Sequence, residues 1–163
     1  MDKKTIYINY QVYHNKEEMP ADLQKVVDAA RKSSLNAYAP YSSFRVGAAV
    51  LLSNDIIFCG NNQENASYPE GLCAERVTLF AAMANYPQES IKTIAICGNP
   101  IHFQLPHPLS PCGACRQVMV EYENKFHHPI QVVMCTMSGE CIVVESAKDL
   151  LPLQFSSNDL NGK

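Results

Sequence analysis

Two short cysteine clusters, far apart in the chain, place the strongest constraint on its fold. Cys73 and Glu75 belong to the segment Cys-Ala-Glu, and Cys112 and Cys115 belong to Pro-Cys-Gly-Ala-Cys. Three thiolates can hold a zinc ion tetrahedrally and leave its fourth position open, which is typical of a catalytic rather than a structural zinc. If the three cysteines share one ion, the fold must bring both segments together.

Both clusters stand where the sequence pattern predicts that helices begin. Apolar residues at helical spacing follow Cys73, and a second helix is expected to start at Cys112 or the residue after it and to reach Tyr122. Unpaired N–H groups and the helix dipole stabilise anions at such positions and lower thiol pKa values. Cys112 and Cys115 lie on one helical turn, which suits chelation. Glu75 can then move protons for a zinc-bound water.

Three thiolates on Zn²⁺ leave a net negative charge that hinders ionisation of the bound water. Arg76 directly follows Glu75, and Arg116 directly follows Cys115. We expect these two cations and the two helix ends to offset that charge, so that the water ionises near neutral pH.

A pair of cysteines three residues apart also fits a structural zinc or a redox pair. A structural zinc needs a fourth ligand. The alternatives for that ligand are Cys59, Cys97, Cys135, Cys141, His102 and His107. We interpret these four cysteines as core residues of strands and the two histidines as loop residues, because a closed structural site gives Glu75 no role.

The remaining sequence alternates between strand and helix patterns and predicts an α/β fold. The expected strands cover residues 5–12, 44–52, 56–59, 93–97, 131–135 and 141–145, and the expected helices cover 20–35, 73–84, 112–122 and 147–151. This order predicts a three-layer sandwich with a central mixed sheet of about five strands flanked by helices. Residues 1–20 are expected to be an N-terminal extension with a strand, and residues 21–163 a single catalytic domain.

Composition narrows the possible functions and compartments. The formal net charge is −3 and the basic residues are scattered, which argues against a nucleic-acid partner. No stretch is long and apolar enough for a membrane span, and the first twenty residues lack the apolar core of a signal peptide. Seven cysteines is an odd number that fits a reducing compartment better than a disulfide framework. We therefore expect a cytoplasmic protein without a membrane partner.

The sequence resembles the zinc-dependent cytidine deaminases of the short, single-domain type. The segments that carry this resemblance are residues 37–50, 60–68, 73–76 and 110–118, together with 150–157, which resembles the C-terminal end of the family. The resemblance implies a cytidine deaminase-like fold. It also implies one Zn²⁺ per subunit, bound by Cys73, Cys112 and Cys115, with Glu75 as the proton shuttle.

The resemblance also implies how the substrate is held. Asn62 and Glu64 match the pair that binds the ribose hydroxyls, and Phe44 matches the aromatic residue that packs on the pyrimidine. The backbone of Ala74 faces the carbonyl of the base, and Arg76 donates hydrogen bonds to ligand sulfurs. Relatives of this length are homotetramers, and Tyr68 and Phe155 match residues that reach the site of a neighbouring subunit.

The activity implied by the resemblance is hydrolytic deamination of cytidine and 2′-deoxycytidine to uridine and 2′-deoxyuridine, with release of ammonia, as in pyrimidine salvage. The partner is then a small-molecule nucleoside. Four alternatives stay open: a deaminase of blasticidin-type nucleosides, a deoxycytidylate deaminase, a polynucleotide deaminase and a non-catalytic zinc module. A deoxycytidylate deaminase usually has histidine where Cys73 stands, and the Asn62 and Glu64 pair favours a free ribose.

Overall fold

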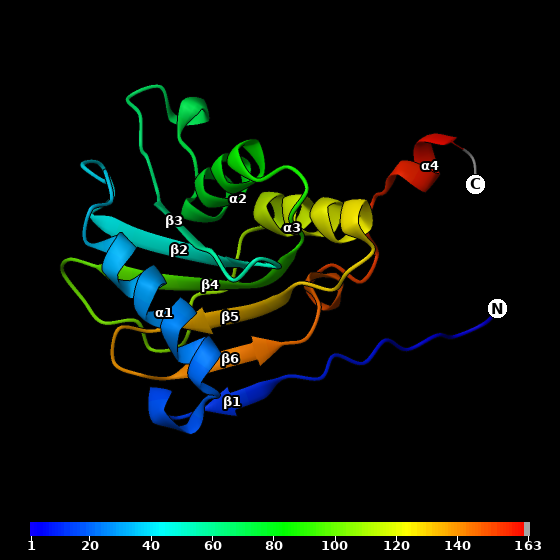
Figure 1. Ribbon diagram of the computed structural model, residues 1–163, viewed down its shortest axis with the longest axis horizontal. Helices are drawn as coiled ribbons and strands as arrows, with labels where there is room; N and C mark the ends of the chain where they lie inside the picture. Colours follow the sequence, from blue (N-terminus) through cyan, green and yellow to red (C-terminus); the bar gives the residue numbers. More distant parts are fainter. Residues whose placement is uncertain (162–163) are drawn as a thin grey trace.

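The computed structural model describes residues 1–161, and within that range the chain forms one six-stranded mixed sheet with helices on both faces (Figure 1). The strand order is β1-β6-β5-β4-β2-β3. β4 and β5 pair in parallel, and the other neighbouring strands pair antiparallel. The predicted three-layer sandwich is confirmed. The sheet has six strands, where about five were expected, since the short N-terminal strand joins one edge.

The sequence pattern located every strand of the sheet, but some boundaries differ. The strands are β1 (Gln11–Tyr13), β2 (Phe44–Leu52), β3 (Ile57–Asn61), β4 (Ile91–Pro100), β5 (Gln131–Cys135) and β6 (Cys141–Val144). The helices are α1 (Ala21–Ser34), α2 (Ala74–Asn85), α3 (Gly113–Phe126) and α4 (Ser157–Asn161), with single turns η1 (Lys16–Glu18), η2 (Tyr68–Glu70) and η3 (Ala147–Leu150). β4 is longer than expected at both ends. The strand expected over residues 5–12 is reduced to β1, and the chain before it extends away from the sheet (Figure 1).

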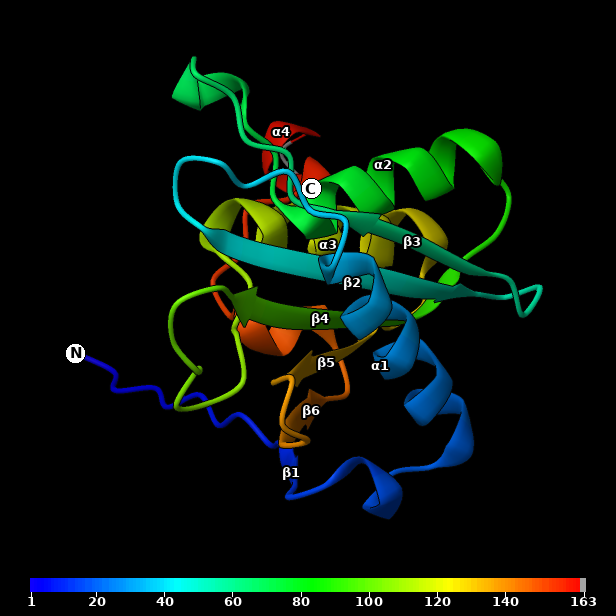
Figure 2. The ribbon, with the colours of Figure 1, turned by 90° about the vertical axis from the view of Figure 1, so that its left-hand side faces the viewer.

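Helices cover the two faces of the sheet unequally. Figure 2 shows α2 and α3 on one side of the sheet and α1 on the other. The buried apolar positions of α1 follow helical spacing: Leu23, Val26, Val27 and Ala30. They pack on small side chains of the sheet, including Ala49 of β2 and Ala95 of β4. The second core cluster joins the sheet to α2 and α3.

Gly47 of β2 allows α1 to approach the sheet closely. A Cβ added at Gly47 would lie 2.0 Å from the carbonyl oxygen of Ala30 and 2.4 Å from the backbone nitrogen of Ser34. We expect Gly47→Ala to lower the free energy of unfolding by at least about 2 kcal/mol, because these backbone atoms yield only if the helix shifts. Gly113→Ala is a matched control, because an added Cβ there meets nothing within 4 Å. Urea unfolding measures both, and equal stability of the two variants would contradict this explanation.

The arrangement of α2 and α3 determines where the two cysteine segments meet. The two helices lie side by side on the same face of the sheet (Figure 1), and each begins directly after a cysteine, Cys73 or Cys112.

None of the helices within residues 1–161 has the length and hydrophobicity needed to cross a bilayer.

Candidate active site

Three cysteine sulfurs converge where α2 and α3 begin. The Sγ atom of Cys112 lies 3.8 Å from that of Cys73 and 3.4 Å from that of Cys115, and all three lie within 4.8 Å of one another. Tetrahedral zinc with Zn–S bonds of about 2.3 Å holds its sulfurs about 3.8 Å apart, so this donor set fits zinc. The fold therefore brings together the two segments that the sequence places far apart.

Within residues 1–161, no fourth histidine, cysteine, aspartate or glutamate joins the three sulfurs. The alternative cysteine ligands lie elsewhere. Cys97, Cys135 and Cys141 are buried under α1, on the opposite face of the sheet, as expected for core residues. Cys59 was expected in the core as well, but that prediction is wrong: it is exposed on β3.

The environment of Cys73 favours its thiolate. The pKa of Cys73 is lowered to about 5, mainly because Cys115 donates a hydrogen bond to it and further because the Arg76 guanidinium lies close, while burial opposes the shift. The Nη2 atom of Arg76 lies 3.8 Å from the Cys73 sulfur. The hydrogen bond to Cys73, and then burial, raise the pKa of Cys115. Metal binding must displace the protons that the sulfurs still carry, so affinity should fall as the pH falls.

Arg116 forms hydrogen bonds away from the three sulfurs, and the charge offset expected from it stays a prediction. Its guanidinium donates to the backbone oxygens of Pro111 and Leu150, at 2.8 Å and 3.1 Å, and to the hydroxyl of Ser110 at 3.0 Å. Arg116 therefore ties the segment before α3 to η3. Of the two arginines, Arg76 is the one whose guanidinium contacts a ligand sulfur.

Glu75 is the second residue of α2, and only 4% of its surface is exposed. Burial raises the pKa of its carboxyl group, and the negative charge of Cys73 acts in the same direction. A carboxyl group with a raised pKa can accept and return a proton closer to neutral pH. Glu75 lies on the wall of a cavity of about 320 Å³, together with Cys73, Cys112 and Ala74.

The other end of this cavity is polar and includes Asn62 and Glu64. The side-chain oxygen of Asn62 accepts from the backbone N–H of Val46 at 2.7 Å, and its amide group donates to the backbone oxygen of Phe44 at 3.0 Å. These bonds fix the Asn62 side chain against β2. Each of its polar groups can form a further bond, since an amide nitrogen has two hydrogens and a carbonyl oxygen two lone pairs.

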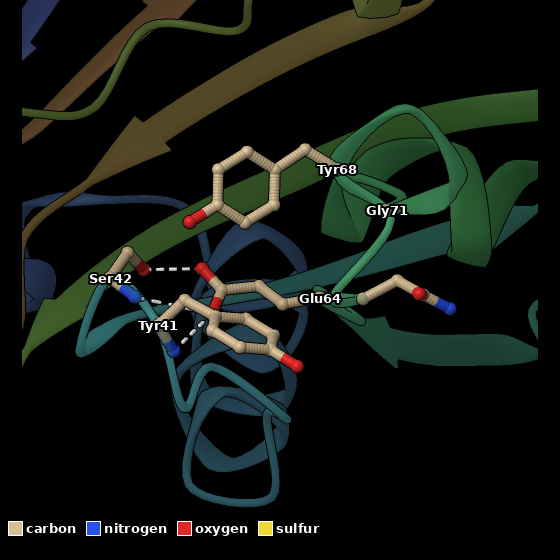
Figure 3. Close-up of a pocket in the computed structure, with 6 residues that line it drawn as sticks. Tyr41, Ser42, Glu64, Tyr68 and Gly71 are labelled. Carbon is tan, nitrogen blue, oxygen red and sulfur yellow. Dashed lines mark hydrogen bonds between the residues drawn. The ribbon is translucent and has the colours of Figure 1, made fainter.

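Glu64 is held by the turn at Tyr41 and Ser42, which follows α1 and precedes β2. Its carboxylate accepts from the backbone N–H groups of Tyr41 and Ser42, at 2.8 Å and 3.2 Å, and from the Ser42 hydroxyl (Figure 3). Burial acts to raise the pKa of Glu64, but these hydrogen bonds lower it. Tyr41 and Ser42 belong to the segment 37–50 that carries the family resemblance, but no role in holding Glu64 was predicted for them.

Tyr41 and Ser42 also line a neighbouring hollow of about 390 Å³, which shares Glu64, Tyr68 and Gly71 with the cavity beside the cysteines (Figure 3). The rings of Tyr41 and Tyr68 meet edge to face, with centroids 5.9 Å apart. The two hollows therefore form one continuous groove that runs from the cysteine sulfurs past Glu64.

Phe44, Phe155 and Tyr68 differ in their relation to this groove. Phe44 is half-buried at the start of β2, where its ring contacts that of Phe103 with centroids 6.1 Å apart. Phe155 is exposed beside α3, and its backbone oxygen accepts from Gln117 at 2.8 Å. Tyr68 is exposed and lines the groove of its own chain. Their expected contacts with the base and with neighbouring subunits stay predictions.

Comparison with known proteins identifies the class to which this site belongs. The family described as "Cytidine and deoxycytidylate deaminase zinc-binding region" matches residues 20–128. The chain belongs to this family.

Individual relatives are cytidine deaminases of similar length. The chain is similar to the cytidine deaminase of Sporosarcina psychrophila, with 37% identity over 86% of this chain and 96% of the relative. It is 38% identical to a probable cytidine deaminase of Dictyostelium discoideum, over 87% of this chain and 89% of that protein. The crystal structure of the Burkholderia pseudomallei cytidine deaminase superposes with a TM-score of 0.72, at 40% identity, and covers 84% of this chain and 100% of that one.

Proposed function

We propose that the protein catalyses the zinc-dependent hydrolytic deamination of cytidine and 2′-deoxycytidine, a reaction of pyrimidine salvage that releases ammonia. The observation that carries this proposal is the convergence of three cysteine sulfurs beside the buried Glu75, on the wall of a cavity. Relatives named cytidine deaminase, aligned over most of the chain, support it.

Cys73, Cys112 and Cys115 would hold the zinc ion, which would supply the Lewis-acid chemistry that makes water nucleophilic near neutral pH. Glu75 accepts a proton from the attacking water and delivers it to N3 of the pyrimidine. It then takes up the second proton of that water, from the hydroxyl now bonded to C4, and donates it to the amino group, which leaves as ammonia while the C4 carbonyl forms. The positive charge of Arg76 partly neutralises the Cys73 thiolate. The thiolate would then donate less charge to the zinc ion, which would stay a stronger Lewis acid.

Substrate is held at the polar end of the groove. Asn62 and Glu64 bind the ribose hydroxyls, the backbone of Ala74 faces the carbonyl of the base, and Phe44 packs on the pyrimidine. The turn at Tyr41 and Ser42 supports this arrangement, because its N–H groups orient the Glu64 carboxylate before substrate arrives. A fixed carboxylate loses less conformational freedom on binding than a mobile one.

Glu64→Gln should raise KM for cytidine and lower kcat/KM by about 10- to 100-fold, since a hydrogen bond to a charged group contributes about 1.5–3 kcal/mol. Cytosine, which has no ribose, should be processed equally by the variant and the unmodified protein. Glu70→Gln is a matched control, because Glu70 lies in η2 and is exposed. Steady-state kinetics on both substrates make the test, and an unchanged KM for cytidine in Glu64→Gln would exclude the ribose contact.

The proposed function is tested by a substrate panel of cytidine, 2′-deoxycytidine, deoxycytidylate and cytosine. Zinc-loaded protein is assayed by the absorbance change of deamination, with and without a chelator. We expect the two nucleosides to give the highest kcat/KM and the chelator to abolish turnover. A preference for deoxycytidylate would identify a nucleotide deaminase instead, and no turnover of any of the four would refute the proposal.

We also propose a cytoplasmic homotetramer in which Tyr68 and Phe155 reach neighbouring subunits. Both aromatic side chains are largely exposed in the single chain, which supports a role in contacts between chains. The seven cysteines are all unpaired within residues 1–161, as is usual in a reducing compartment. Sedimentation equilibrium tests the assembly, and a monomer that retains full activity would contradict it.

A further inference from the structure

Three cysteines outside the deaminase site form a row across β4, β5 and β6. Cys97 pairs in register with Cys135, and Cys135 pairs in register with Cys141. All three side chains are fully buried in the core cluster beneath α1. This row lies on the face of the sheet opposite to α2 and α3, so the proposed catalytic mechanism does not use it.

The backbone geometry of Cys135 and Cys141 favours a direct bond between them. The N–H of Thr136 donates to the carbonyl oxygen of Glu140 at 3.0 Å, which makes Cys135 and Cys141 a non-hydrogen-bonded pair of the antiparallel ladder. The Cα atoms of such pairs are about 4.5 Å apart, within the range of about 4.4–6.8 Å found for disulfides. The two sulfurs can therefore bond without a movement of the strands.

Arg31 of α1 places a positive charge beside the row, where it adds to a hydrogen bond from Cys135 in lowering the pKa of Cys97 as well as that of Cys141. Its Nε atom donates to the backbone oxygen of Thr136 at 3.0 Å, and its Nη2 atom is buried with no hydrogen-bond partner among residues 1–161. The pKa of Cys141 is lowered, first by a hydrogen bond from Cys135 and then by the charge of Arg31, while burial opposes the shift. Hydrogen bonds to Cys141 and Cys97, together with burial, raise the pKa of Cys135.

A hollow lies beside the end of the row, next to residues that directly follow Cys97 and Cys135. A cavity of about 300 Å³ lies at the ends of β4 and β5 and is lined in part by Gly98, Thr136 and Met137. The Met137 sulfur lies 3.5 Å from the Cys97 sulfur, and 44% of the Met137 surface is exposed. Hydrogen peroxide in this hollow is separated from the buried thiols by the Met137 side chain and the adjoining backbone, so it reaches them only when that side chain moves.

We propose that Cys135 and Cys141 form a dithiol that reacts with hydroperoxides and closes to a cross-strand disulfide. The Cys141 thiolate attacks one oxygen of hydrogen peroxide, which breaks the O–O bond, releases hydroxide and leaves a sulfenic acid on Cys141. The Cys135 sulfur then attacks the Cys141 sulfur, forms the S–S bond and releases water. The two thiols lose two electrons and two protons in total, and the peroxide is reduced to two molecules of water.

Peptide mass spectrometry tests this proposal on the full-length, zinc-loaded protein. After hydrogen peroxide treatment, free thiols are alkylated and the protein is digested with trypsin. Cleavage after Lys125 and Lys148 leaves Cys135 and Cys141 on one peptide, whereas Cys97 lies on the peptide that ends at Arg116. We expect the first peptide to be unalkylated and lighter by two hydrogens. A cross-link between the two peptides, or complete alkylation of the first peptide while zinc is lost, would overturn the proposal.

Three variants separate this reaction from general oxidation of cysteines. Cys97→Ala should still form the disulfide, whereas Cys141→Ala should leave Cys135 available for alkylation. Arg31→Met should slow disulfide formation by about threefold for each unit by which the pKa of Cys141 rises, because the thiolate fraction falls about tenfold while the remaining thiolate becomes about threefold more nucleophilic. An unchanged rate in Arg31→Met would show that the arginine does not promote the reaction. Loss of the disulfide in Cys97→Ala would show that Cys135 and Cys141 are not the pair that forms the bond.

Discussion

Glu75→Gln should lower kcat by at least about 10²–10⁴-fold while zinc stays bound. The glutamine side chain has nearly the same shape as the carboxyl group, but it cannot accept a proton from water or return it to the substrate. Glu75 does not belong to the group of metal-binding residues, so the three sulfurs should hold the ion as before. The expected variant is thus metal-loaded, folded and almost inactive.

Zinc content by elemental analysis and kcat for cytidine, measured on the same preparation, test this prediction. Glu70→Gln is the control, because it makes the same chemical change at an exposed position in η2. Near-normal turnover of Glu75→Gln with zinc bound would show that another group transfers the protons.

The same variant should make the zinc-free protein more stable at neutral pH. Burial raises the pKa of Glu75 above its unfolded-state value, so the folded protein holds the proton more tightly than the unfolded chain does. Stability therefore falls as the pH rises from the unfolded-state pKa to the folded-state pKa. At higher pH the ionised, buried Glu75 destabilises the folded state. Glutamine never ionises, so Glu75→Gln should have the higher Tm at pH 7 and lose this advantage in acid. A lower Tm at pH 7 would contradict the sign of the shift.

Cys112→Ala should reduce deaminase activity by more than about 10³-fold through loss of the metal. Removing a group that merely supports a ligand costs about 10- to 100-fold in affinity or activity, and loss of a ligand itself should cost more. Cys112 lies between the other two sulfurs, at 3.8 Å from Cys73 and 3.4 Å from Cys115. Two thiolates would remain in the variant, too few for tight zinc binding.

Cys59→Ala is the control for this prediction, because Cys59 is an exposed cysteine on β3 outside the sulfur group. Zinc per subunit and activity should fall together in Cys112→Ala and stay unchanged in Cys59→Ala. Added zinc should restore the unmodified protein after chelation, but not Cys112→Ala. Full activity of Cys112→Ala would mean that the metal is bound elsewhere.

The sheet strands and helices α1 to α3 could be predicted because their apolar residues follow strand or helix patterns, whereas α4 was not expected. The strand expected over residues 131–135 coincides with β5, and α1 shows its apolar stripe in the sequence. The N-terminal strand was overestimated for a reason that lies outside its own sequence. Only Gln11–Tyr13 find partners, because β6 offers four residues and is paired at Val143, Ile142 and Cys141. Alternating apolar and polar residues identify a segment that can pair as a strand. The length of the neighbouring strand determines how many of its residues pair.

The candidate site likewise contains residues that could be predicted from the sequence and contacts that could not. The cysteines and Glu75 could be predicted from local sequence, since their residue types and spacing are rare outside metal sites. The support of Glu64 by Tyr41 and Ser42 could not, because backbone N–H groups make much of that contact and any residue except proline supplies one. Arg116 shows that a position next to a ligand in the sequence does not establish what a side chain contacts in the fold. Its position beside Cys115 suggested that its charge offsets that of the thiolates, but its guanidinium donates to the backbone oxygens of Pro111 and Leu150.

X-ray absorption at the zinc edge of the purified protein reports directly on the metal that these residues are proposed to hold. We expect a single class of zinc with three sulfur neighbours at about 2.3 Å and one oxygen at about 2.0 Å, without the outer-shell signal of an imidazole. Four sulfur neighbours, or a histidine nitrogen in place of the oxygen, would mean a closed structural site and would contradict the account of this protein as a deaminase.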